Sequence, residues 1–333
     1  SLEDTGEAAE SLGKKGTDAM EAVAMEMVAQ GIQGKVKDVA DALRDCVEAA
    51  IEWESAFTGV EKTVDGTEQE IEGLRREIQE MSTRLPYSTT EIAAIAEIAG
   101  QLGVKVTDIA SFTETVLGLS SATNITAEEA ATMLAQYANV TKLDTSKYGN
   151  IGAVIVALGN NFATTESKVA DMSQRIAATA TQAGISAPEI MGIAAAVSSV
   201  GIESEAGGTA ISKLISSVQM AVETGKGLED YAKVAGVTAD AFKQKWGEDA
   251  VGAIQLFIKG LSDTERNGKS AVAVLSDMGI KETRLTNTIL SLSQASDVMT
   301  DAVDMANIAF EENTALTEEA GKRYATTESK IQL

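Results

Sequence analysis

Histidine is absent from this chain of 333 residues, and cysteine occurs only once. Without histidine, the sequence excludes Ser-His-Asp and Cys-His catalysis and every metal site that requires an imidazole ligand. A single cysteine excludes an intramolecular disulfide framework. We expect this residue, Cys46, to be a small buried apolar side chain on a helix seam rather than a reactive thiol.

Aromatic residues and proline are also scarce. Aromatics make up 4% of the sequence and there are 2 prolines, whereas 44% of the residues are hydrophobic and 28 are glycine. This composition favours closely packed helices joined by glycine turns over a sandwich or barrel, so the predicted fold class is all-α.

Positive charge is in the minority, since 27 Lys and Arg stand against 50 Asp and Glu, a formal net charge of -23. Tight phosphate binding needs clustered cations, so direct nucleic-acid binding is not expected. The longest apolar run, Ile151 to Leu158, is far shorter than the roughly 18 residues of a membrane span. The stretch "DTERNG" at 263–268 resembles a calcium loop only faintly, because position twelve is Val274 instead of Glu. We therefore predict no catalytic residues, no cofactor site and no metal site.

Helix boundaries are marked throughout the chain. A glycine followed by a branched apolar residue is typical of a left-handed helix stop, and this pair occurs at Gly103-Val104, Gly184-Ile185, Gly201-Ile202, Gly236-Val237 and Gly279-Ile280. Capping boxes, in which a hydroxyl and a carboxylate satisfy free backbone N–H groups, are predicted at Ser88/Glu91, Thr126/Glu129, Ser186/Glu189 and Ser262/Glu265. Between these signals the apolar residues recur at helical spacing, and each helix is expected to bury one face.

The stretch "FATTESK" at 162–168 returns as "YATTESK" at 324–330, but the flanking residues do not match. We interpret the pair as a helix start, in which a threonine caps and Glu166 or Glu328 lies in the first turn. Because Leu333 follows soon afterwards, residues 321–333 are predicted to be the truncated start of a following helix, and the sequence is expected to be a fragment.

A seven-residue apolar register runs from Val36 to Leu85, interrupted by Gly59 and Gly66, and Thr67/Glu70 indicates a fresh helix start. Two interpretations remain open: self-association through a coiled coil, or a helical hairpin folded on its own core. The candidate oligomer seam consists of Val36, Leu43, Trp53, Phe57, Val60, Ile71, Leu74 and Ile78. We expect a heptad-patterned helical arm over residues 1–86 and a compact multi-helix core over residues 87–320.

Several stretches together resemble the core region of phage tail tape measure proteins, in that family's order and over roughly residues 50–330. They are "ESAFTGVEKTVDGTEQEIEGLRREI", "EIAAIAEIAGQLGV", "ITAEEAATMLAQYANVT", "IVALGNNFATTESKVADMSQRI", "SSVGIESEAGGTAISKLI", "GKSAVAVLSDMGI" and "EENTALTEEAGKRYATTESK". The resemblance implies a non-enzymatic structural virion protein that lies in the tail tube lumen, sets tail length during assembly in the host cytoplasm, and leaves ahead of the DNA at ejection.

The implied partners are the tail tube protein, tail assembly chaperones and tail tip proteins, and a homo-oligomer is expected. Two other functions are considered. A membrane-active segment of the ejection channel needs long apolar runs or basic amphipathic helices, and liposome binding would reveal it. A peptidoglycan-degrading tail enzyme would clear suspensions of cell walls.

Overall fold

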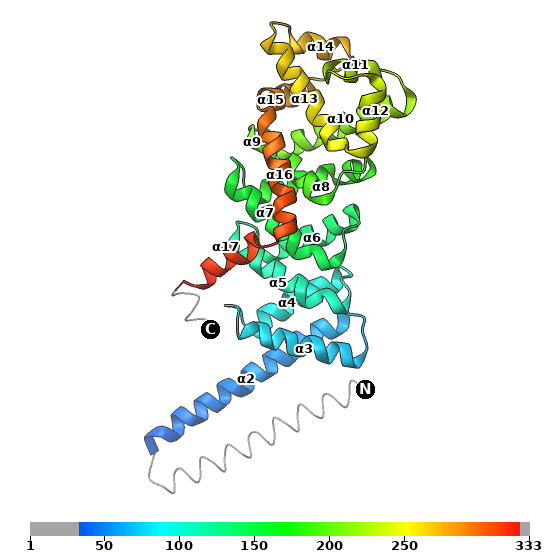
Figure 1. Cartoon of the computed structure of the whole chain (residues 1–333). Helices are drawn as coiled ribbons and strands as arrows, with labels where there is room; N and C mark the ends of the chain where they lie inside the picture. Colours follow the sequence, from blue (N-terminus) through cyan, green and yellow to red (C-terminus); the bar gives the residue numbers. More distant parts are fainter. Residues whose placement is uncertain (1–32, 327–333) are drawn as a thin grey trace.

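The computed structural model describes residues 33–326, with side chains from residue 44 onward. This part of the chain consists of 16 α-helices and one 3-10 helix, and it contains no strand (Figure 1). The predicted all-α fold class is confirmed. None of the described helices is both long enough and apolar enough to cross a lipid bilayer.

The helices follow one another closely along the chain. Their bounds are α2 (Gln33–Thr63), α3 (Glu68–Ser82), α4 (Thr89–Gln101), α5 (Val106–Ala122), α6 (Ala127–Thr141), η1 (Thr145–Lys147), α7 (Tyr148–Asn161), α8 (Glu166–Gln182), α9 (Ala187–Ser199), α10 (Ser204–Thr224), α11 (Leu228–Val234), α12 (Ala239–Glu248), α13 (Ala250–Arg266), α14 (Ala271–Asp277), α15 (Thr283–Gln294), α16 (Ser296–Glu312) and α17 (Ala315–Tyr324).

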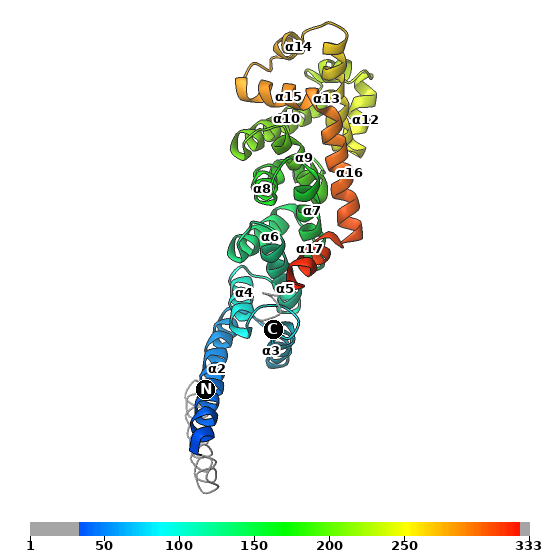
Figure 2. The ribbon, with the colours of Figure 1, turned by 90° about the vertical axis from the view of Figure 1, so that its left-hand side faces the viewer.

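Helices α3 to α10 stack into a column. Each contacts the next helix in the chain and also the one after it, so α3, α5, α7 and α9 form one layer and α4, α6, α8 and α10 form the other. Figures 1 and 2 show α2 at one end of this column and α11 to α15 at the opposite end. Stacking of this kind buries a continuous core although each helix meets only its neighbours, as in helical solenoids.

Side-chain N-caps mark the start of half of the 16 α-helices that the structure describes. The capping boxes of α3, α4, α6 and α9 form as the sequence predicts, at Thr67, Ser88, Thr126 and Ser186. Thr165 caps α8, with its hydroxyl accepting the N–H of Lys168, and Glu166 lies in the first turn. In the second copy, Tyr324 is the last residue of α17 and Ala325 is its C-cap, and the copy from residue 327 onward lies outside the described residues.

The capping box predicted at Ser262 is wrong. Ser262 is buried inside α13, which begins twelve residues earlier, where the Asp249 carboxylate accepts the N–H of Gly252. The pattern Ser-x-x-Glu occurs here within an amphipathic helix, and packing of Leu261 in the core carries the helix through it. A capping pattern therefore indicates a helix start only where the preceding residue leaves the helix.

The glycine stops are confirmed at all the predicted positions. Gly103, Gly184, Gly201, Gly236 and Gly279 have φ values between 71° and 82°. At Val104, Ile185, Val237 and Ile280 the N–H following the glycine reaches back to the carbonyl oxygen five residues earlier, the bond of a Schellman motif. These turns reverse the chain between layers of the column.

The last two helices return along the column. Helix α16 contacts α13, α9 and α7, and α17 continues onto α7 and α5 (Figure 2). A Cβ atom at Gly192 of α9 would lie 2.7 Å from the Cα of Val303 in α16, so these two backbones cross at close range. The buried Asn150 of α7 donates from Nδ2 to the carbonyl oxygen of Phe310, 2.6 Å away. We call α16 and α17 the return strap.

Candidate functional surfaces

The predicted seam residues lie on α2 and α3. Phe57, Val60, Leu74 and Ile78 are buried, and Trp53 and Ile71 are half-buried and pack against the same core. Val36 and Leu43 belong to the part of α2 whose side chains are outside the described residues. The described seam side chains therefore pack within one chain, where α2 lies against α4 and α3 lies against α4 and α5. Self-association through the rest of the register stays a prediction.

Arg75 of α3 joins the two helices of the arm. Its guanidinium lies 4.2 Å from the ring centroid of Phe57 and forms ion pairs with Glu54 at 2.9 Å and Glu61 at 3.2 Å. The Phe57 ring also packs against Trp53, with centroids 5.3 Å apart. A cation over an aromatic face, with carboxylates around it, links α3 to the buried end of α2 through this one side chain. The heptad pattern did not reveal this arginine, because it occupies a polar position of the register.

The outer part of α2, by which we mean residues 44–52, has a different environment. All residues from 44 to 52 are exposed, including Val47 at 37% and Ile51 at 64%. Cys46, expected to be buried, is exposed as well. The expectation fails because a heptad pattern identifies an apolar face but not the element that covers it. No other described helix packs against residues 44–52 of α2.

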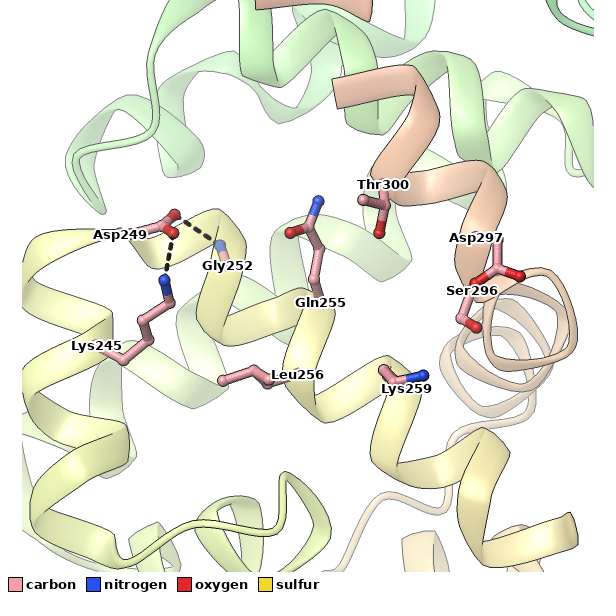
Figure 3. Close-up of a pocket in the computed structure, with 9 residues that line it drawn as sticks. All are labelled: Lys245, Asp249, Gly252, Gln255, Leu256, Lys259, Ser296, Asp297 and Thr300. Carbon is pink, nitrogen blue, oxygen red and sulfur yellow. Dashed lines mark hydrogen bonds and ion pairs between the residues drawn. The ribbon is translucent and has the colours of Figure 1, made fainter. Parts of the chain in front are cut away.

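A pocket of about 370 Å³ opens between α12, α13 and α16 (Figure 3). At one end Lys245 Nζ lies 2.7 Å from Asp249 Oδ2, and Asp249 Oδ1 accepts the N–H of Gly252 at 2.7 Å. Burial alone would raise the pKa of Asp249, but the hydrogen bonds from Lys245 and Gly252 outweigh it and lower the pKa. Asp249 therefore stays ionised as the cap of α13, which makes it a poor proton donor.

The other end of this pocket is formed by Lys259 of α13 with Ser296 and Asp297 of α16 (Figure 3). A second pocket of about 290 Å³ adjoins it on the side of α11 and shares Leu256 and Lys259 with it. We call the two together the α13 groove. Neither α13 nor this groove is predicted by the sequence patterns, because the groove residues come from four separate helices.

The chemistry of the α13 groove suits recognition of a charged segment. Its lining combines the apolar side chains of Leu256, Val234 and Ala235 with separated ammonium groups. No hydrogen bond within the described part of the chain joins the hydroxyl of Ser296 or Thr300 to a base, as an activated nucleophile would require. Among the described residues, no group of three or more His, Cys, Asp or Glu side chains is placed to hold a metal ion.

Comparison with known proteins gives one family. The model of the family described as phage-related minor tail protein matches residues 75–279, more than half of the chain, from the middle of α3 to the turn after α14. No curated protein and no solved structure matches the chain significantly. The outer part of α2 and the return strap lie outside the matched residues.

Proposed function

The chain belongs to the phage-related minor tail protein family, which assigns it a structural role in a phage tail, and from this premise we propose that it is the core region of a tape measure protein. In this proposal the full-length protein sets tail length during assembly and is expelled ahead of the DNA at genome ejection. The match over residues 75–279 carries the proposal, and the stretches that resemble tape measure proteins support it.

In this proposal the matched region binds partners and does not itself measure tail length. As one straight helix, 333 residues would measure about 500 Å at roughly 1.5 Å per residue. The matched residues instead form a stack of short helices that reverse at glycine caps. A folded stack of this kind does not lengthen in proportion to residue number. We therefore assign length measurement to extended helical segments elsewhere in the full-length protein, and partner binding to this column.

The proposed partners are the tail tube protein, tail assembly chaperones and tail tip proteins. The protein would meet the chaperones in the host cytoplasm and the tube and tip in the virion, where it lies in the tube lumen. An acidic surface suits a protein that shares a conduit with DNA, because like charges keep the two apart.

Tail lengths in electron micrographs test whether length measurement and partner binding belong to different regions of the protein. In the full-length protein, in-frame deletions in extended helical segments outside residues 87–320 should shorten tails by about 1.5 Å per residue removed. Deletion of residues 186–224 removes α9 and α10 and exposes the faces that they cover on α7, α8 and α16. This deletion should abolish assembly or misdirect it. Viable tails shortened in strict proportion to it would refute the proposal.

A deletion of equal length in an extended segment is the matched control, because it removes the same number of residues without opening a core. The purified chain of 333 residues should also leave liposomes and cell-wall suspensions unchanged if this region acts only structurally. Liposome binding would favour the membrane-active alternative, and clearing of cell walls would favour the lytic one.

A further inference from the structure

We propose that this chain associates head to tail with further copies of itself, the outer part of α2 in one copy docking into the α13 groove of the next. The proposal joins two surfaces at opposite ends of the column (Figure 1). It does not depend on the tape measure assignment, because it concerns only the described residues of this chain.

The first observation is the uncovered apolar face of α2. Val47 and Ile51 are one helical turn apart and therefore lie on the same side, and both are exposed. No residue between 44 and 52 is buried. An isolated helix of this kind is only marginally stable in water, since tertiary packing supplies most helix stability. A partner surface with an apolar floor would cover these two side chains.

The second observation is the charge of the same helix segment. Asp45, Glu48 and Glu52 are exposed, and none of them forms an ion pair with another described residue. With Arg44 as its cation, the segment 44–52 still has an excess of two carboxylates, and it has two exposed apolar side chains. Its partner should offer an apolar floor and unpaired cations.

The α13 groove offers both. Leu256 and Val234 are half-buried and provide apolar surface on its floor. Lys259 and Lys269 are exposed, and neither is ion-paired within the described residues. The carboxylates that line the groove are largely neutralised by neighbours: Lys245 pairs with Asp249 and Arg266 with Asp263, which leaves Asp297 against two free ammonium groups.

The distribution of charge along the chain singles out this end of the column. Residues 226–295 contain nine Lys and Arg and nine Asp and Glu, so the formal net charge of -23 arises entirely outside them. An acidic helix that approaches any other part of the column meets net repulsion. At α11 to α15 it meets a neutral surface with free lysines, so electrostatics direct it there.

The two surfaces differ, so their contact is heterologous. A heterologous contact leaves one free groove and one free helix at the ends of every assembly, and growth continues unless a ring closes. The donor and acceptor lie at the two ends of the column, so the copies should follow one another in a row.

Light scattering of the full chain over a range of concentrations tests the proposal. At low ionic strength the weight-average mass should rise steadily with concentration, without a plateau at two or three chains. Near 1 M salt, where the screening length is about 3 Å, it should fall toward the mass of one chain.

Charge-reversal variants identify the surfaces. A groove variant, Lys259→Glu with Lys269→Glu, and a helix variant, Glu48→Lys with Glu52→Lys, should each remain monomeric. Mixing the two variants should restore growth, because each helix then meets a groove of opposite charge. The control Lys62→Glu with Lys105→Glu makes the same change in charge at exposed lysines outside both the groove and residues 226–295, and it should associate like the parent.

Three results would overturn the proposal: a parent chain that stays monomeric at every accessible concentration, a finite dimer or trimer that ignores the charge reversals, or two variants that fail to associate when mixed. The finite oligomer would instead support the seam of the Val36 to Leu85 register. None of these results bears on tail length, so the proposed function can stand or fall separately.

Discussion

Helix α9 is mostly apolar by sequence, and the outer part of α2 is amphipathic. The two helices have opposite environments in the structure. Nearly every residue of α9 is buried, because α7, α8, α10 and α16 surround it. In α2, no residue from 44 to 52 is buried. The buried residues of α9 are Ala, Gly, Ile, Met and Val with Pro188 and Ser198, and Glu189 lies in its first turn, whereas outer α2 has carboxylates beside its apolar side chains. The comparison teaches that a helix can be surrounded on all sides only if its whole circumference is small or apolar.

Within α2 the same contrast can be tested by truncating two side chains. Phe57→Ala should lower the free energy of unfolding by about 3–5 kcal/mol, because Phe57 is fully buried and lies beneath Arg75. Ile51→Ala should change it by less than about 0.5 kcal/mol, because the side chain is exposed. Urea unfolding in high salt, where self-association is screened, measures both. Equal losses would show that outer α2 is covered within the chain.

The close approach of α9 to the return strap predicts a second large effect. Gly192→Val should cost about 3 kcal/mol, because its Cβ would lie 2.7 Å from Val303 Cα and 2.9 Å from the carbonyl oxygen of Ala302, and backbone atoms cannot move aside cheaply. Gly247→Ala is the control in α12, where no atom lies within 4 Å of the new Cβ. This control should stabilise the protein by about 0.5–1 kcal/mol. Thermal unfolding that ranks the two variants equally would contradict the crossing.

The turns into α9 and α12 test backbone conformation without packing. Gly184 and Gly236 have φ of 81° and 71°, and a Cβ at either position would meet no atom within 4 Å. Gly184→Val or Gly236→Val should therefore cost more than about 1 kcal/mol through strain alone. Gly184→Asn should cost less, since asparagine tolerates the left-handed region. Unchanged melting temperatures for both valine variants would refute the left-handed caps.

The stability that an ionised carboxylate contributes to a capping box should depend on pH, whereas the stability from buried apolar side chains should not. The backbone N–H of Thr126, followed by its hydroxyl, donates to the Glu129 carboxylate and lowers the pKa of Glu129. A lowered folded-state pKa contributes stability that is complete above the unfolded value of about 4.3 and is lost as pH falls through the folded value. Glu129→Gln should therefore flatten the fall in melting temperature between about pH 5 and pH 3. Identical acid profiles for the parent and the variant would argue against this capping box.

Signals that act over a few residues were read correctly from the sequence in most cases. The glycine stops and four capping boxes, including the one at Thr67, depend on backbone groups within six residues of each other, so the residue types suffice to predict them. Ser262 shows the limit of this reasoning, because its pattern is local but core packing extends α13 through it.

Cys46 and Arg75 show a second limit. The heptad register placed Cys46 on a covered seam and gave no role to Arg75, but the structure leaves the cysteine exposed and sets the arginine over Phe57. Both outcomes depend on which helix lies opposite, and a periodic pattern contains no information about the partner.

The sequence by itself determined the all-α class, most helix ends and the acidic surface, because composition and short-range hydrogen bonding do not depend on distant residues. Only the tertiary structure decided the two-layer column, the return strap across Gly192 and the α13 groove. These features join residues far apart in the chain: Asn150 meets Phe310, and Lys245 shares a pocket with Asp297. Such pairings are selected by how well helix faces fit together, and that fit exists only once the helices are packed.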